Sequence, residues 1–169
     1  MTYNLRYIFL DVDGVLNNRD SYSNGVHTPN GYTGAEDSLI ERLKTLCSEN
    51  TLIILTSDWK DSAKADVVNT HGHYLIEKLK EHGLYIHDMT EDKAHALRGN
   101  GVMSYLRNHD IDPVDGCYVI FDDHTFDFGN YSDTLYRHFV RTNSYYGLTD
   151  KDVLKAEDIL SGHLRNIDD

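Results

Sequence analysis

Residues 8–17 carry the sequence IFLDVDGVLN, which places two carboxylates two residues apart directly after an apolar run. The run from Tyr7 to Leu10 predicts a buried strand, and the turn-prone Asp-Val-Asp-Gly predicts that this strand ends there. Like charges beside a buried strand repel each other, so they require a compensating partner. A bound divalent cation is one such partner. The structural alternative is a turn in which Asp11 or Asp13 only caps backbone amides.

Two more apolar runs end in polar residues. One extends from Thr51 to Leu55, and the other from Cys117 to Phe121, followed by Asp122 and Asp123. Weaker strand candidates cover residues 84–87 and 138–142. Helix-period segments alternate with these runs, which predicts βαβ units and a parallel sheet. We therefore predict an α/β fold with a doubly wound parallel sheet in a single domain, residues 1–169, with the polar clusters gathered at the carboxyl ends of the strands.

Helical periodicity covers four segments: Glu36 to Ser48, Ala63 to His82 with a break at 71–73, Gly101 to His109, and Asp150 to Leu160. Thr33 followed by Glu36 predicts a capping box for the first helix, and Thr149 with Asp152 predicts one for the last. Residues 17–37 are rich in Gly, Asn, Ser and Tyr and predict a long loop or short hairpin. Loops of this length serve as lids over a site or as plain connections, and both remain open here.

Composition excludes several classes of protein. The formal net charge of −12 argues against an extended nucleic-acid-binding surface, because such surfaces depend on Lys and Arg. No apolar run is long enough for a membrane span, and no signal peptide precedes the first strand, so we expect a soluble, cytoplasmic protein. Cys47 and Cys117 lack metal or redox spacing and are expected to be reduced. The ten histidines form no HExxH motif; His71 and His73 are expected in a loop or at the surface.

The strand followed by Asp-x-Asp-Gly resembles the first motif of the haloacid dehalogenase (HAD) superfamily. The resemblance implies a Rossmann-like fold and a magnesium-dependent phosphatase in which Asp11 is the nucleophile, forms an aspartyl-phosphate and binds the metal. Asp13 would act as general acid and base and would also belong to the metal site. Gly14 would let the chain turn tightly enough for backbone groups to approach the phosphate.

The later motifs of the superfamily have matches in the same order. Thr56 follows the second strand and would hold a phosphoryl oxygen, with Ser57 as the alternative. Arg98, at the start of an apolar helix, would supply the cation that offsets negative charge, with Lys93 as a rival. The acidic cluster after the third strand would bind magnesium, directly through Asp123 and with the support of Asp122 and Asp127.

Over about residues 7–160 the motif order is similar to the small HAD domains of "Swiss Army knife" RNA-repair proteins and to the phosphatase domains of polynucleotide kinase/phosphatases. This resemblance implies a phosphate on a nucleotide or a polynucleotide end. Lys60 is a candidate substrate-binding residue; it stands where an Arg is common, and Lys does not reproduce the bidentate grip of Arg on a substrate phosphate. Tyr22, Tyr32 and Trp59 are candidates to stack on a base, or else packing residues.

Two alternatives to a phosphatase remain at this point. One is a non-catalytic HAD-like module that binds a phosphorylated ligand or a protein, and the other is a phosphotransferase with an acceptor other than water. The intact set of Asp11, Asp13, Thr56 and Asp123 argues against the first alternative, because a pure binder has less need of a nucleophile beside a proton shuttle. The sequence leaves the oligomeric state open.

Overall fold

The computed structural model describes residues 4–164 and residue 166. Five parallel strands form one sheet in the order β3-β2-β1-β4-β5, with β1 at its centre. The strands are β1 (Arg6–Leu10), β2 (Thr51–Leu55), β3 (Ile86–Met89), β4 (Tyr118–Asp122) and β5 (Phe139–Arg141). The predicted α/β fold with a parallel sheet is confirmed, and the described residues include no cap domain.

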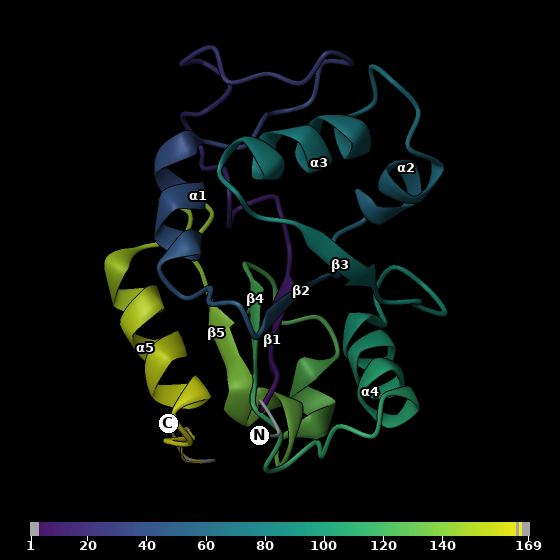
Figure 1. The fold of residues 1–169 in the computed structure, drawn as a ribbon, viewed down its shortest axis with the longest axis vertical. Coiled ribbons are helices and arrows are strands. Elements are labelled where there is room, and N and C mark those ends of the chain that lie inside the picture. Colours follow the sequence, from purple (N-terminus) through teal and green to yellow (C-terminus); the bar gives the residue numbers. More distant parts are fainter. Residues whose placement is uncertain (1–3, 165, 167–169) are drawn as a thin grey trace.

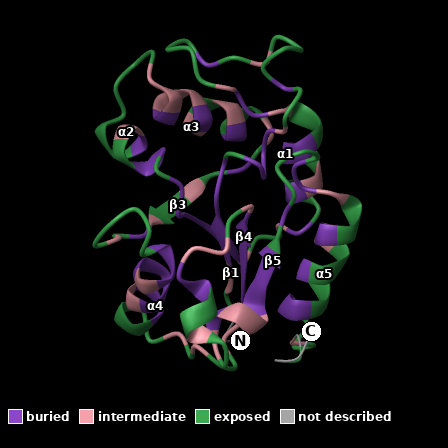
Figure 2. Ribbon diagram, turned by 180° about the vertical axis from the view of Figure 1, so that it is seen from behind, coloured by how far each residue is buried: buried purple, intermediate pink, exposed green. Residues whose placement is uncertain are grey.

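Helices cover both faces of the sheet (Figure 1). One face packs against α1 (Asp37–Lys44), α3 (His71–Glu81) and α5 (Asp150–Leu160), and the other against α4 (Arg98–Asn108) and the 3-10 turns η1 (Phe128–Tyr131) and η2 (Leu135–His138). Alternation along each strand produces these two cores. In β1, Ile8 and Leu10 face the first core and Phe9 the second, and all three are fully buried. The central strands are drawn mostly in the colour of buried residues (Figure 2).

The register of the central strands brings the predicted motifs to one edge of the sheet. Leu10 lies opposite both Leu55 of β2 and Phe121 of β4. The backbone ladder continues one step beyond the strands, since the amide of Asp11 donates to the carbonyl of Phe121 (3.0 Å) and the amide of Thr56 donates to that of Leu10 (2.9 Å). The residues that follow the three strands therefore lie side by side.

The helix break predicted at residues 71–73 is misplaced. α2 (Lys60–Ala65) ends at Asp66, which has φ +47°, and α3 begins at His71 after Thr70, whose hydroxyl accepts a hydrogen bond from the amide of His73. The break therefore covers residues 66–70. Gly72 is required for packing, because a Cβ atom there would lie 2.1 Å from the backbone nitrogen of Ala63. His71 and His73 accordingly occupy the first turn of a helix, half-buried.

Two capping boxes were predicted, and one is wrong. The N-cap of α1 is Glu36 rather than Thr33, and it makes no side-chain capping bond. Its side chain instead accepts a hydrogen bond from Ser21 Oγ at 2.5 Å, which ties the preceding loop to α1. At α5 the predicted box is confirmed, with Thr149 and Asp152 satisfying each other's backbone amides.

Residues 17–37 form a loop of turns with an isolated antiparallel bridge between His27 and Thr33. The bridge matches the predicted long loop or short hairpin, and a role as a lid stays a prediction. Cys47 and Cys117 are free and half-buried, as expected. Among the described residues there is no helix with the length and apolar character that crossing a membrane requires.

Candidate active site

A cavity of about 240 Å³ opens at the carboxyl ends of β1, β2 and β4. Five of its lining residues were predicted from sequence, and the other four are polar or aromatic neighbours. The lining residues are Asp11, Asp13, Ser57, Asp58, His95, Arg98, Asp123, His124 and Phe126. Motifs more than a hundred residues apart in sequence therefore share one site.

Arg98 joins two buried carboxylates at the floor of this cavity. Its Nη1 lies 2.9 Å from Oδ1 of Asp11 and 2.6 Å from Oδ2 of Asp122, while Nη2 lies 3.5 Å from Oδ1 of Asp58. Arg98 is the first residue of α4, so the helix aims the guanidinium at the strand ends. Lys93 is exposed and is not among the described residues that line the cavity. The geometry therefore favours Arg98 over Lys93 as the cation of the site.

One guanidinium does not fully offset these acids. Burial raises the pKa of Asp11 well above its ordinary value, and the charge of Asp122 raises it further against the opposing effect of Arg98. Burial also raises the pKa of Asp122. The site thus holds more negative charge than its own cation neutralises, which is the electrostatic condition that a bound divalent cation would relieve.

Asp13 is held by two side chains that the sequence did not connect with it. Nε1 of Trp59 donates to Asp13 Oδ2 and Nδ2 of Asn17 donates to Asp13 Oδ1, both at 2.9 Å. The Asn17 side chain also accepts from the amide of Gly14 at 2.9 Å, so it bridges the two ends of the turn. Asp13 itself is exposed to the cavity while Trp59 is buried. This carboxylate therefore has a fixed orientation although it is open to solvent.

Gly14 packs against the acidic cluster that follows β4. Its φ of +74° lies in the region that favours glycine, and a Cβ atom there would be 2.5 Å from Oδ2 of Asp123. The carbonyl of Gly14 accepts a hydrogen bond from Thr142 Oγ1 at 2.8 Å. Glycine is therefore required at this position because it lets Asp123 approach the turn that follows β1, a contact that was not predicted from the sequence.

Three polar residues after β2, namely Thr56, Ser57 and Lys60, differ in their burial and hydrogen bonding. Oγ1 of Thr56 is fully buried and has no hydrogen-bond partner in the described part of the chain. Ser57 lines the cavity, and its Oγ accepts a long hydrogen bond of 3.4 Å from the amide of Trp59. Lys60 is buried away from the cavity lining, where it pairs with Asp92 and donates to the carbonyl of Thr56 at 3.1 Å. Its direct contact with substrate therefore stays a prediction without support from the geometry.

Asp122, Asp123 and His124 place one ligand atom each within 4.8 Å of one another. Asp127 behaves differently: its two carboxylate oxygens accept from the amides of Gly99 and Asn100 at 2.6 and 3.0 Å. It therefore caps the first turn of α4 and fixes the helix that carries Arg98. Support of a metal ion by Asp127 stays a prediction, and its observed contacts are with the helix that carries Arg98.

Aromatic side chains that were not predicted from the sequence form one rim of the cavity. The ring of Phe126 lies over the guanidinium of Arg98, 4.4 Å from Cζ to the centroid, and Phe126 adopts φ +44°. His95 and His124 flank it, each with Nδ1 2.6 Å from a carboxylate, Asp58 and Asp123 respectively. No motif or spacing identified this rim, because its members come from two unrelated loops.

A second aromatic group stands on the other side of Asp13. Tyr32, Trp59 and His71 contact one another, with ring centroids 4.3 Å apart for Tyr32 and His71 and 5.0 Å for Trp59 and His71. Burial lowers the pKa of His71, and the negative charge of Asp13 acts against that effect. Tyr22, the third aromatic residue considered in the sequence, contacts His27 instead.

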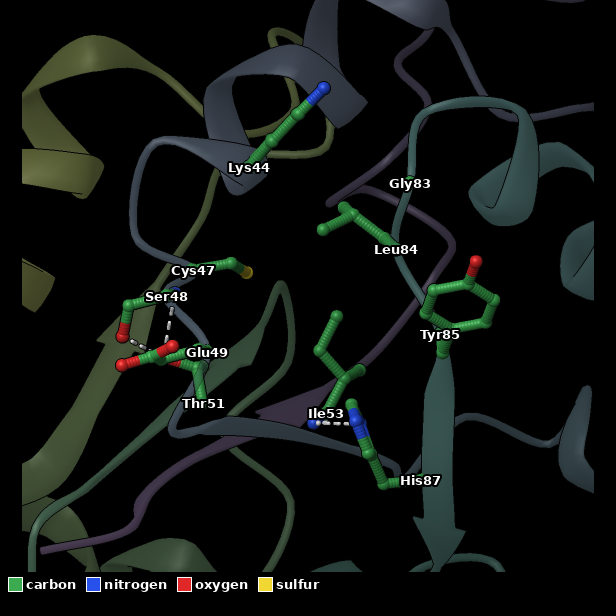
Figure 3. Close-up of a pocket in the computed structure, with 10 residues that line it drawn as sticks. All are labelled: Lys44, Cys47, Ser48, Glu49, Thr51, Ile53, Gly83, Leu84, Tyr85 and His87. Atoms are coloured by element: carbon green, nitrogen blue, oxygen red, sulfur yellow. Dashed lines mark hydrogen bonds between the residues drawn. The ribbon is translucent and has the colours of Figure 1, made fainter. Parts of the chain in front are cut away.

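Another cavity, of about 420 Å³, lies at the opposite ends of the strands (Figure 3). It is bounded by the start of β2, the turn before β3 and the segment after α1. Its lining residues are Lys44, Cys47, Ser48, Glu49, Thr51, Ile53, Gly83, Leu84, Tyr85 and His87. His87 is engaged in accepting a hydrogen bond from the amide of Ile53 (3.0 Å), and burial raises the pKa of Cys47 to about 11. This cavity offers no activated group, so the acidic cavity is the candidate active site.

Comparisons with known proteins identify the family of the chain. The family described as the HAD domain in Swiss Army Knife RNA repair proteins matches residues 7–153, a range that contains every residue of the acidic cavity. Searches of curated proteins and of solved structures found no significant match. On the strength of this match over most of its length, the chain belongs to the HAD domain family of Swiss Army Knife RNA repair proteins.

Proposed function

We propose that the protein is a magnesium-dependent phosphomonoester hydrolase that acts through an aspartyl-phosphate at Asp11. The observation that carries the proposal is the pairing of Arg98 with both Asp11 and Asp122, beside an Asp13 whose two oxygens are held by Asn17 and Trp59. Such an arrangement separates two carboxylates by role. Asp11 is buried against a cation, whereas Asp13 is exposed and lines the cavity.

In the proposed reaction a carboxylate oxygen of Asp11 attacks phosphorus and the bond from phosphorus to the ester oxygen breaks. Asp13 gives its proton to that leaving oxygen, so the alcohol departs neutral. Asp13 then takes a proton from a water molecule that attacks the aspartyl-phosphate, which releases inorganic phosphate and regenerates Asp11. Arg98 offsets the charge on Asp11 through both steps, and the hydroxyl of Thr56 or Ser57 contacts a phosphoryl oxygen.

The donor set fits magnesium. Oxygen atoms of Asp11, Asp13, Asp122 and Asp123 surround the cavity or its floor, and this hard cation prefers a few carboxylates with water and phosphate. The raised pKa of Asp11 supports the same reading, because the excess of negative charge there calls for a cation. Bound magnesium would offset the charge of the phosphoryl group and of the acids that hold it. His124 is a weaker candidate ligand, since its imidazole bonds to Asp123.

The family supports a nucleotide or a polynucleotide end as the substrate. A phosphate-release screen with nucleoside 3′- and 5′-monophosphates, 3′- and 5′-phosphorylated oligonucleotides and sugar phosphates tests the proposal. We expect release that requires magnesium and is lost in Asp11→Asn and Asp13→Asn. Tight binding without release from any member would identify a binding module instead, and transfer of phosphate to an added alcohol at the expense of water would identify a phosphotransferase.

A further inference from the structure

The position of the general acid determines where the organic part of a substrate lies, and this step rests on the proposed function. Asp13 would protonate the leaving oxygen, so the group attached to that oxygen lies next to Asp13. The side chains around Asp13 therefore contact the leaving group rather than the phosphate. Two of them, Asn17 and Trp59, are occupied in holding the carboxylate.

The surface beyond them is the aromatic wall, which consists of Tyr32, Trp59 and His71. Trp59 connects the wall to the chemistry, because its indole nitrogen donates to Asp13 at 2.9 Å. Its ring contacts both His71, with centroids 5.0 Å apart, and Tyr32, with centroids 6.3 Å apart. A leaving group bound to the oxygen beside Asp13 thus lies next to the residue that Trp59 holds, and the rings of His71 and Tyr32 lie beyond Trp59.

Only part of this wall is open to a ligand. Trp59 is 3 % exposed and is covered, whereas Tyr32 is 51 % exposed and His71 is half-buried. Hydrogen bonds hold the ring of His71 and the backbone of Tyr32 in place. Nδ1 of His71 lies 3.0 Å from Nδ2 of Asn30, and the backbone of Tyr32 exchanges hydrogen bonds with Thr28, itself buried, through its Oγ1 and its amide. A ligand that stacks here therefore causes little further loss of side-chain conformational entropy.

We infer that Tyr32 and His71 form a subsite for a nucleobase attached to the sugar whose oxygen is released. Every base offers a planar π face, and stacking on aromatic side chains does not depend on its identity. The net charge of −12 strengthens the choice, because a chain with 28 acidic and only 16 basic residues gains little from contacts to a phosphate backbone and must hold a nucleotide by other contacts. A sugar phosphate without a base leaves the aromatic wall unused.

The inference is tested first by ligand comparison, which needs no change at the wall. The Asp11→Asn chain with magnesium is titrated with adenosine 3′-monophosphate, adenosine 5′-monophosphate, ribose 5-phosphate and a 3′-phosphorylated trinucleotide. Calorimetry measures affinity, and the fluorescence of Trp59, the single tryptophan, reports on the wall itself. We expect at least one adenosine nucleotide to bind about tenfold more tightly than ribose phosphate and to change Trp59 emission. Equal affinities, or no change in emission, overturn the subsite.

Variants then identify the residue. Tyr32→Leu removes the ring, Tyr32→Phe keeps it, and Tyr22→Leu is the matched control, because Tyr22 lies in the same loop with the same 51 % exposure but contacts His27. We expect Tyr32→Leu to weaken nucleotide binding about tenfold and leave ribose phosphate unchanged, while Tyr32→Phe and Tyr22→Leu behave as the parent chain. The assignment is contradicted if Tyr32→Leu weakens the binding of nucleotide and of ribose phosphate equally, or if Tyr22→Leu weakens nucleotide binding as much as Tyr32→Leu does.

The outcome separates the subsite from the proposed function. If the wild-type chain releases phosphate from nucleotide and sugar phosphate with the same KM, hydrolysis stands and the subsite fails. If nucleotides bind and change Trp59 emission but nothing is hydrolysed, the subsite stands and the hydrolase proposal fails. The trinucleotide distinguishes the source of the base: tighter binding than the mononucleotide indicates a polynucleotide end, and equal or weaker binding indicates a free nucleotide.

Discussion

Nη1 of Arg98 lies 2.9 Å from Oδ1 of Asp11, with 3 % of the first residue and 4 % of the second exposed. The same nitrogen lies 2.6 Å from Asp122, so one buried cation serves two buried acids. Removing the cation would leave both carboxylates uncompensated, which costs far more than the pairing itself contributes. The contact is therefore a requirement of the fold as well as of the proposed chemistry.

The first prediction concerns this cation. We expect Arg98→Met to lower the free energy of unfolding at neutral pH by about 3–5 kcal/mol and to abolish phosphate release, with Arg98→Lys intermediate in both. Urea unfolding and a phosphate-release assay measure the two effects. Arg107→Met is the control, since Arg107 lies exposed on the same helix and its replacement should change stability by about 0.5 kcal/mol or less. Equal stability of the two Met variants would refute a structural role for Arg98.

The second prediction concerns the first turn. Gly14→Ala meets both a positive φ and Asp123, whereas Gly25→Ala meets a φ of +87° with no atom within 4 Å of the added Cβ. We expect the free energy of unfolding of each variant to fall by about 1–2 kcal/mol, because an alanine at a positive φ strains the backbone. Only Gly14→Ala should also weaken magnesium binding, measured by calorimetry, because the added carbon displaces Asp123. Unchanged magnesium affinity in Gly14→Ala would show that Asp123 does not bind the metal.

The third prediction decides between Thr56 and Ser57. The hydroxyl of Thr56 is buried and has no hydrogen-bond partner among residues 4–164 and 166, so replacing it by a methyl group in Thr56→Val should leave stability unchanged or raise it by about 1 kcal/mol. If this hydroxyl contacts the phosphoryl group, the same change should lower kcat/KM at least about tenfold. Ser57→Ala provides the comparison. If Ser57→Ala lowers kcat/KM while Thr56→Val has normal kinetics, the contact with the phosphoryl group belongs to Ser57.

The fourth prediction concerns pH. Nδ1 of His82 lies 2.5 Å from Glu41 and Nε2 lies 2.8 Å from Asp37, and these hydrogen bonds raise the pKa of His82 above its ordinary 6.5. A raised histidine pKa contributes stability that is complete below about pH 6.5 and is lost as the pH rises through the value in the folded protein. We therefore expect His82→Gln to lower Tm modestly at pH 6 and hardly at pH 9.

His163→Gln is the control for that experiment, since His163 is exposed near the end of the described chain. A Tm difference between wild type and His82→Gln that stays the same at pH 6 and pH 9 would show that packing, and not charge, accounts for the effect of His82.

The strands and the acid positions were predictable from sequence because they depend on local patterns. β2 occupies the predicted residues Thr51–Leu55, and the acids after β1 and β4 lie together because parallel strands end at one edge. Contacts between side chains from distant loops were not predictable. The bond from Trp59 to Asp13 spans 46 residues, and neither residue carries a signal for the other.

The misplaced helix break has a similar cause. Glycine at position 72 suggested an interruption, but this residue lies inside a helix because α3 packs against α2 too closely for a side chain. Thr70 and the positive φ of Asp66 and Asn69 set the true break. At α1, the pattern of Thr33 and Glu36 matched a capping box, yet Glu36 is held by Ser21 from the preceding loop. Tertiary contacts override local signals in both cases.

Detection of the phosphorylated intermediate tests the central claim most directly. Wild-type protein is mixed with magnesium and a substrate identified by the phosphate-release screen, quenched in acid within the first turnover, digested, and analysed by mass spectrometry. The account predicts one added phosphoryl group on the peptide that contains Asp11, present in wild type and absent in Asp11→Asn. Phosphate release without any phosphorylated peptide, or with the phosphoryl group on another residue, would contradict it.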